Sequence, residues 1–192
     1  MRRAFILFSS LALVFSFAFD VAAQRDYFTP EEVELIRDAQ EIDHRIDVLV
    51  HAIDRRFSAL SLDVVPPKRL QTGEIWGGIP VGTRLQLLYD IKRIMEKAVD
   101  DIDSLAERPA SIVVYTEPNK AKAKTPKGFS ELFPKAVRDL AAAAQRWGPV
   151  LKAELDKRND MAEQGSVLDS LQMCDEIIAA VAKLPAEIKK PK

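Results

Sequence analysis

The chain has 192 residues, long enough for a single domain that buries about two thirds of its unfolded surface in one core. Its 28 Lys and Arg residues nearly balance 29 Asp and Glu residues, which argues against general binding to nucleic acids or membrane surfaces. Cys174 is the only cysteine, so no internal disulfide can form and stability must come from packing.

The first residues have the pattern of a secretory signal peptide. Arg2 and Arg3 precede an apolar run over residues 4–19, and the small residues Ala22 and Ala23 follow it. The run is shorter than the ~20 residues that a bilayer-spanning helix needs, so cleavage after Ala23 is favoured over a retained anchor. No cysteine lies near this junction to carry a lipid anchor. We therefore expect an exported protein, periplasmic or secreted.

Removal of residues 1–23 leaves one predicted helical domain over residues 24–185 and a flexible basic tail over residues 186–192. Loss of Arg2, Arg3 and Asp20 leaves 26 basic and 28 acidic residues, a net charge of about −2 with neutral histidines. The mature charge is still balanced, so the argument against nucleic acids holds for it as well.

The first predicted helix begins at Thr29, because Thr29 can act as N-cap, Pro30 fits the first helical position and Glu32 completes a capping box. An apolar stripe with steps of three and four then predicts a single long helix to about Leu60. The stripe consists of Ile42, Ile46, Leu49, Val50, Ile53, Phe57 and Leu60.

Residues 61–83 lose this period and collect proline and glycine, so they predict an irregular connection. A second helix is predicted from Thr83 to Glu107, before Pro109. Its stripe consists of Leu85, Leu88, Ile91, Met95, Ala98, Ile102 and Leu105. Residues 110–118 are β-branched but have no strand partner, and residues 119–128 form a lysine-rich segment typical of a mobile surface loop.

A third helix is predicted over residues 130–159, with a kink at Trp147 because Pro149 removes a backbone donor. Its stripe consists of Val137, Leu140, Ala144, Trp147, Leu151 and Leu155. Gly165 and Ser166 are expected to open a fourth helix that ends before Pro185. Its stripe consists of Leu168, Leu171, Cys174, Ile178, Val181 and Leu184.

Four amphipathic helices bury their apolar faces most simply against one another. The predicted fold class is therefore all-α: an antiparallel four-helix bundle, coiled-coil-like in its packing, with long irregular connections and a kinked third helix.

The stretch EIDHRIDVLVH, residues 41–51, combines a Glu-x-x-His step with a second histidine. On one helix His44 and His51 lie about 10.5 Å apart along the axis, too far to share one zinc ion. A di-iron site needs the same step on two helices, and the chain has only these two histidines. We predict that both face water, since the apolar stripe lies opposite them; weak adventitious metal binding by Asp47 and His51 is the alternative.

No motif for covalent haem, a phosphate-binding loop, a serine hydrolase or a zinc protease occurs in the sequence. Cys174 lies on an apolar stripe and is expected to be a buried, inert thiol. The residues therefore predict no catalytic site, no metal and no cofactor.

Two features are candidates for a partner surface. Trp76 and Ile79 lie in the glycine-rich segment GEIWGGIPVG, where the indole either caps the end of the bundle or stands exposed for a partner. Lys120, Lys122 and Lys124 either contact acidic envelope polymers or lipid headgroups, or simply keep a loop soluble.

Residues 26–57 resemble the start of a group of uncharacterised exported bacterial helical proteins, which share an acid-aromatic-x-Thr segment and an Ile-Arg-Asp/Glu-Ala-Gln-Glu step. The matching residues are Asp26, Tyr27, Thr29, Glu31, Glu32, Ile36, Arg37, Asp38, Ala39, Gln40, Glu41, Arg45 and Ile46. The resemblance implies an exported helical protein and transfers no activity.

The sequence leaves three hypotheses for function. The first is a non-enzymatic exported protein that binds another envelope component, protein or polymer. The second is an ATP-independent periplasmic holdase chaperone, which kinked amphipathic helices and a mobile loop would suit. The third is a metal-binding protein or enzyme.

Overall fold

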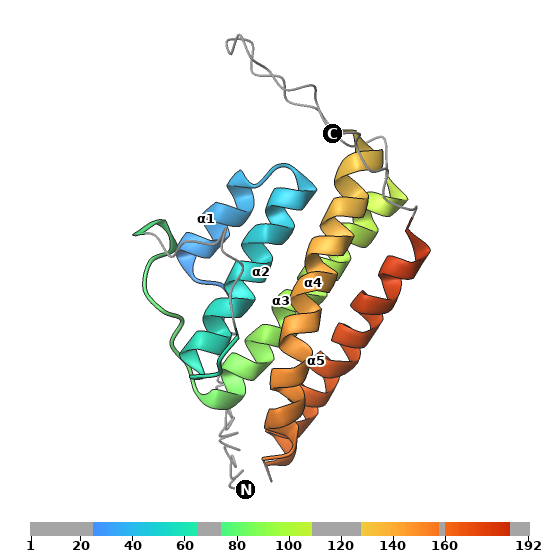
Figure 1. The fold of residues 1–192 in the computed structure, drawn as a ribbon. Helices are drawn as coiled ribbons and strands as arrows, with labels where there is room; N and C mark the ends of the chain where they lie inside the picture. The colour runs from blue at the N-terminus through green and yellow to red at the C-terminus, as the bar shows by residue number, and fades with distance from the viewer. Residues whose placement is uncertain (1–24, 65–73, 109–127, 158–159, 185–192) are drawn as a thin grey trace, which may run out of the picture.

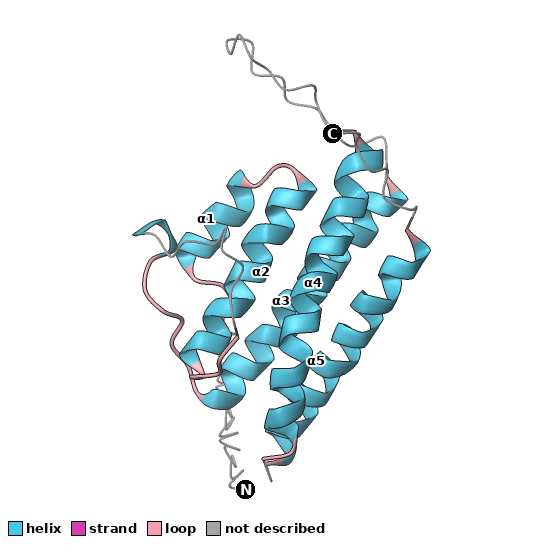
Figure 2. Ribbon diagram, in the orientation of Figure 1, coloured by secondary structure: helices cyan, strands magenta, loops and turns pink. Residues whose placement is uncertain are grey.

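The computed structural model describes residues 25–64, 74–108, 128–157 and 160–184. Within these ranges the chain forms α1 (Pro30–Asp38), α2 (Ile42–Ala59), α3 (Arg84–Glu107), α4 (Phe129–Leu155) and α5 (Met161–Ala180). Short 3-10 turns cover Glu74–Trp76 and Val181–Lys183. No strand occurs among the described residues (Figure 2), so the predicted all-α class is confirmed.

Several predictions fall outside these ranges. The signal peptide, the lysines at positions 120, 122 and 124, and the basic tail over 186–192 all belong to undescribed residues.

The caps of the helices follow from the sequence. The Thr29 hydroxyl accepts from the backbone N–H of Glu32, and the Glu32 carboxylate accepts from the N–H of Thr29, as the capping box predicts. Thr83 and Gln86 form the same reciprocal pair at the start of α3. These side chains satisfy backbone donors that a helix terminus otherwise leaves without partners.

The prediction of one long first helix was wrong, because the chain breaks between α1 and α2. The N–H of Ala39 closes α1 on the carbonyl of Leu35, and α2 begins at Ile42. Ala39 is fully buried in a small apolar cluster with Val48 and Trp76, so α1 folds back onto α2 instead of extending it. No proline or glycine marks this break, which is why periodicity alone missed it.

The main core lies between α2, α3, α4 and α5 (Figure 1). Helix α2 packs against α3 and α4, and α5 packs against the same two helices. Phe57 and Trp147 are fully buried there and stack with ring centroids 6.3 Å apart. Most core positions predicted for the first three stripes are buried, including Ile53, Met95 and Leu140, but Leu85 is 39% exposed and the prediction was wrong for it. Burial of such apolar surface is the main stabilising contribution to the fold.

Helix α4 continues without interruption through Pro134 and Pro149 to Leu155. Trp147 is fully buried, and the apolar stripe of α4 from Val137 to Leu151 faces the core as expected. The helix α5 begins earlier than predicted, at Met161, because the Asp160 side chain accepts from the N–H groups of Ala162 and Glu163 at 2.9 Å.

The predicted stripe of α5 was wrong at Leu168, which is 56% exposed. Cys174 is buried as predicted, and Val167, Ser170 and Ile177, which were not predicted, are buried with it. Helix α5 carries apolar residues on more than one face, so its sequence did not define a single direction for the core.

Candidate ligand pocket

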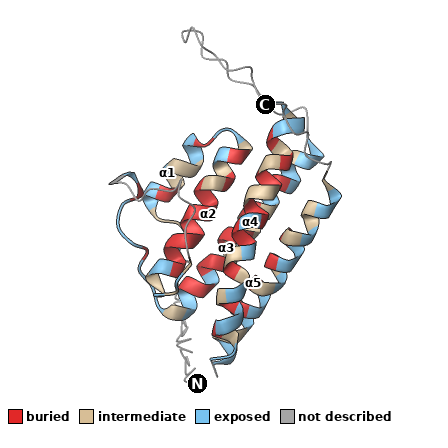
Figure 3. Ribbon diagram, in the orientation of Figure 1, coloured by how far each residue is buried: buried red, intermediate tan, exposed pale blue. Residues whose placement is uncertain are grey.

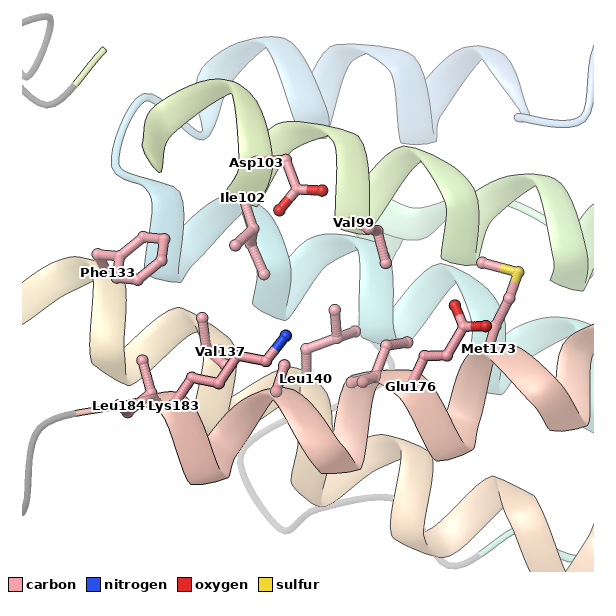
Figure 4. A pocket seen from close by; sticks show the side chains of 12 residues that line it. Val99, Ile102, Asp103, Phe133, Val137, Leu140, Met173, Glu176, Lys183 and Leu184 are labelled. Atoms are coloured by element: carbon pink, nitrogen blue, oxygen red, sulfur yellow. The ribbon is translucent and has the colours of Figure 1, made fainter. Parts of the chain in front are cut away.

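A pocket of about 490 Å³ lies where the end of α3, the start of α4 and the end of α5 meet (Figure 4). Twelve residues line it: Val99, Ile102, Asp103, Phe133, Val137, Leu140, Met173, Glu176, Ile177, Ala180, Lys183 and Leu184. Its volume falls within the range of about 300–1,000 Å³ that is usual for small-molecule sites.

Most of the lining is apolar. Ile102, Val137, Leu140 and Ile177 are almost fully buried and belong to the main core, so they form a floor that is held by the packing of α3, α4 and α5. Phe133 is partly buried and packs against the same core. An apolar cavity of this kind is suited to a hydrocarbon surface, because burial of each methylene group contributes about 0.8 kcal/mol.

Three charged residues complete the lining. Asp103 comes from α3, Glu176 from α5 and Lys183 from the 3-10 turn that follows α5. Figure 4 shows their side chains directed toward the space between α3 and α5. The three residues are exposed, so they lie where the pocket meets solvent.

One of these charges is held in place by a neighbour. The Gln172 side-chain amide donates to Glu176 Oε1 at 2.9 Å, which leaves the second carboxylate oxygen for another partner. Neither Asp103 nor Lys183 forms an ion pair within the described ranges. The polar part of the lining consists of two carboxylates and one amine, and the rest of the lining is apolar.

The prediction that both histidines face water was wrong for His51. His44 is exposed as expected, but His51 is only 3% exposed. The side of α2 opposite the main core is covered by α1 and by the segment that carries Trp76 (Figure 3). The apolar stripe of α2 gave no sign of this second cover, because the covering residues are distant in sequence.

His51 packs against Trp76 with ring centroids 4.1 Å apart, and the Arg55 guanidinium lies 5.6 Å from the centre of the same indole. Burial and, to a smaller extent, the charge of Arg55 lower the pKa of His51 to about 4, while Glu32 acts in the opposite direction. Neither ring nitrogen has a hydrogen-bond partner in the described part of the chain. His51 is therefore a neutral, packed side chain, with no carboxylate to orient it as a base.

A buried charge cluster lies beside this pair. The fully buried Glu32 carboxylate pairs with Arg55 at 2.6 Å and with Arg56, and the Arg56 guanidinium donates to the Tyr27 carbonyl at 2.5 Å. Arg55 also donates to the Gly78 carbonyl. These bonds connect α1, α2 and the Trp76 segment, which identifies the cluster as structural.

The residues of the predicted partner surface have different environments. Trp76 is 7% exposed and lies against α1 and α2, whereas Ile79 is 68% exposed. Ile75 and Val81 are exposed beside Ile79, at 67% and 87%. The lysines predicted as the second part of that surface are outside the described residues.

Cys174 is buried, and burial raises the pKa of its thiol to about 12, with a smaller contribution from Asp175. In the described ranges, no group of three or more His, Cys, Asp or Glu side chains is placed to hold a metal ion. None of the helices in these ranges is both long and apolar enough to cross a bilayer.

The pocket itself was not predicted from the sequence. Nothing in the sequence predicted that Asp103, Glu176 and Lys183 lie near one another. The available signal was the excess of apolar residues on α5, including Met173 and Ile177, which a single stripe could not accommodate. Comparisons of this chain with protein-family models, with curated proteins and with solved structures found no match.

Proposed function

We propose that this chain is a non-enzymatic exported protein that binds another component of the envelope through the pocket between α3, α4 and α5. The observation that carries the proposal is the apolar, 490 Å³ pocket with charged residues only at its opening. A site of this composition binds through buried apolar area, and a few polar groups orient the ligand.

Export is supported by the N-terminal pattern of basic, apolar and small residues. Mass spectrometry of the protein recovered from a secreting host tests it. We expect the mass of a chain that starts at Gln24, and recovery of the intact 192-residue chain inside the cell would contradict export.

We also propose that the four long helices form an antiparallel four-helix bundle and that α4 bends near Trp147. Pro149 supports the bend, because its ring removes one hydrogen bond and crowds the preceding turn. Residual dipolar couplings measured along α4 would give the angle between its two halves, and collinear halves would contradict the bend.

Binding in the pocket can be tested with a naphthylamine dye whose fluorescence rises in apolar surroundings. Ala180 lines the pocket at the end of α5, and its neighbour Ala179 is exposed and does not. Ala180→Phe should fill the pocket and weaken dye binding at least tenfold. Ala179→Phe makes the same substitution outside the pocket and should leave the affinity unchanged.

Equal dye affinity in the wild type, Ala180→Phe and Ala179→Phe would contradict the pocket as the binding site. Circular dichroism of both variants checks that the helices are retained. The two substitutions change adjacent positions on one helix, so a difference between them reports the pocket and not the stability of α5.

An ATP-independent holdase is the second candidate, and the exposed apolar residues Ile75, Ile79 and Val81 favour it. A holdase should suppress aggregation of an unfolded client at near-stoichiometric amounts. Replacement of these three residues by serine should then abolish the suppression. Lack of suppression by the wild-type protein would remove this candidate.

A further inference from the structure

The opening of the pocket carries charges of both signs on opposite helices. Asp103 belongs to α3, whereas Glu176 and Lys183 belong to α5 and its terminal turn. Asp103 and Lys183 remain without a charged partner in the described ranges, and Glu176 is engaged by a neutral amide. A bound group can therefore meet a cation and two carboxylates at the same opening.

The apolar part of the pocket is elongated. Its lining on α4 extends from Phe133 to Leu140, and on α5 from Met173 to Ala180. At 1.5 Å per residue, each of these stretches covers about 10 Å along the helix axis. On α3 the lining covers only Val99 to Asp103, about one turn. A linear apolar chain fits this shape better than a broad ring system.

We infer that the pocket binds an amphiphile with a single alkyl chain and a zwitterionic headgroup. The chain occupies the apolar floor, the anionic group of the head pairs with Lys183, and its cationic group lies between Asp103 and Glu176. This inference rests on the proposed function and specifies the ligand of the same site.

The charges of Asp103, Glu176 and Lys183 determine which kind of headgroup the opening favours. An anionic head can pair with Lys183 but also faces two carboxylates, and a cationic head meets the carboxylates but also faces Lys183. Only a head with both signs gives each of the three side chains an opposite charge. Because the three residues are exposed, each pair contributes weakly, and we expect a preference of about threefold to tenfold at low salt.

The test uses the full mature protein and four dodecyl amphiphiles below their micelle concentrations: a phosphocholine, a trimethylammonium, a sulfate and a maltoside. Each displaces the naphthylamine dye in a competition titration. The phosphocholine should displace the dye at the lowest concentration, and its advantage over the maltoside should shrink at high ionic strength. Shorter chains should bind more weakly, by up to about fourfold for each methylene group removed from the pocket.

Lys183→Glu makes the opening entirely acidic, so the trimethylammonium compound should become the preferred ligand. Lys152→Glu is the matched control, because Lys152 is exposed on α4 outside the pocket and the substitution changes the net charge equally. The order of headgroup preference should be the same in Lys152→Glu and in the wild type.

The outcomes separate the two proposals. Displacement of the dye by all four amphiphiles with equal affinity, unchanged in Lys183→Glu, would overturn the zwitterionic ligand and leave the apolar site intact. A dye that binds equally well to Ala180→Phe would instead contradict the site itself. A preference for the trimethylammonium or the sulfate compound in the wild type would also overturn the inference.

Discussion

The imidazole of His51 lies edge-on against the indole of Trp76, with ring centroids 4.1 Å apart. The contact closes the space between α2 and the segment that precedes α3, on the side away from the main core. His51 is buried there without a hydrogen bond in the described ranges, so the neutral ring is the form that fits. Protonation of His51 should therefore destabilise its contact with Trp76.

Stability should fall when the pH falls below 6.5. The pKa of His51 is about 4 in the folded protein and 6.5 in its ordinary state, so between these values the unfolded chain binds a proton that the folded protein excludes. The stability associated with neutral His51 is fully present above pH 6.5 and declines by up to about 1.4 kcal/mol per pH unit toward pH 4. Urea unfolding at pH 7 and pH 4.5 measures the change.

The variant His51→Phe isolates this contribution, because phenylalanine keeps a ring against Trp76 and cannot titrate. Other groups also titrate, including the buried Asp54 and Asp90, whose pKa values are raised by burial, but they are common to both proteins. Between pH 7 and 4.5 the wild type should lose about 2 kcal/mol more than His51→Phe. Parallel pH profiles for the two proteins would show that His51 is not protonated on unfolding.

Glu32 should be among the most sensitive positions in the chain. Glu32→Gln keeps the size and the capping role of the side chain but removes the only carboxylate that is paired with Arg55 and Arg56 in the described ranges. An uncompensated buried charge costs about 3–5 kcal/mol, so we expect a loss of that size in the free energy of unfolding. Thermal or urea unfolding at pH 7 measures it.

Glu34→Gln provides the control for the same substitution in the same helix. Glu34 pairs with Arg37 at 2.6 Å, but both side chains are more than 60% exposed. An exposed pair of this kind contributes less than about 1 kcal/mol. Similar losses in Glu32→Gln and Glu34→Gln would mean that the buried cluster relaxes and lets water reach its arginines.

The elements that local chemistry defines were predictable. The capping box at Thr29 and Glu32, and the apolar steps from Leu88 to Ile102, depend on neighbours within one or two turns, and the structure has the corresponding helices. The burial of the His51 side chain was not predictable, because α1 and Trp76, which cover it, are more than ten residues away in the sequence. The predicted burial of Leu168 was wrong for a different reason. Helix α5 has apolar residues on several faces, and only its packing against α3 and α4 determines which face is buried.

The pocket was not predictable either, because it also depends on contacts between residues that are distant in sequence. Asp103, Glu176 and Lys183 lie up to 80 positions apart, and each looks like an ordinary exposed charge on its own helix. Their shared location follows from how the ends of α3 and α5 pack around α4, which is a tertiary property. Apolar periodicity identifies the face of a helix that is buried. It does not show where the ends of three packed helices leave a pocket between them.

Removal of the hydrogen bond inside the main core should destabilise the fold. Trp147 Nε1 donates to Asp54 Oδ1 at 2.7 Å, and Arg146 lies at 3.2 Å from the other oxygen. Burial raises the pKa of Asp54, while the bonds from Trp147 and Arg146 oppose that rise. Trp147→Phe removes a donor from a buried carboxylate, and we expect a loss of about 1–3 kcal/mol in addition to any cavity effect.

A double-mutant cycle separates the hydrogen bond from the cavity. The cycle combines Trp147→Phe with Asp54→Asn, and the free energy of unfolding is measured for each single variant and for the pair. Residues in direct contact show coupling of about 0.5–3 kcal/mol. Additive effects of the two substitutions would indicate that the indole contributes through its packing against Phe57 alone.

Gly77 should tolerate substitution less well than its neighbour Gly78. Its φ of +63° lies in the left-handed region, and a Cβ atom would lie 2.7 Å from Cδ of Glu31. The Glu31 side chain is exposed and can move, so backbone strain of about 1–2 kcal/mol is the main cost expected for Gly77→Ala. Urea unfolding of the variant measures this cost.

Gly78→Ala is the matched control, because no atom lies within 4 Å of its added Cβ and its φ is not in the left-handed region. We expect it to be neutral or to stabilise the fold by a few tenths of a kcal/mol, since alanine reduces the entropy of the unfolded chain. Gly77→Asn should cost less than Gly77→Ala, because asparagine adopts the left-handed conformation more readily. Equal stability of Gly77→Ala and Gly78→Ala would mean that the turn after Trp76 can adopt another backbone conformation without disturbing the contact with His51.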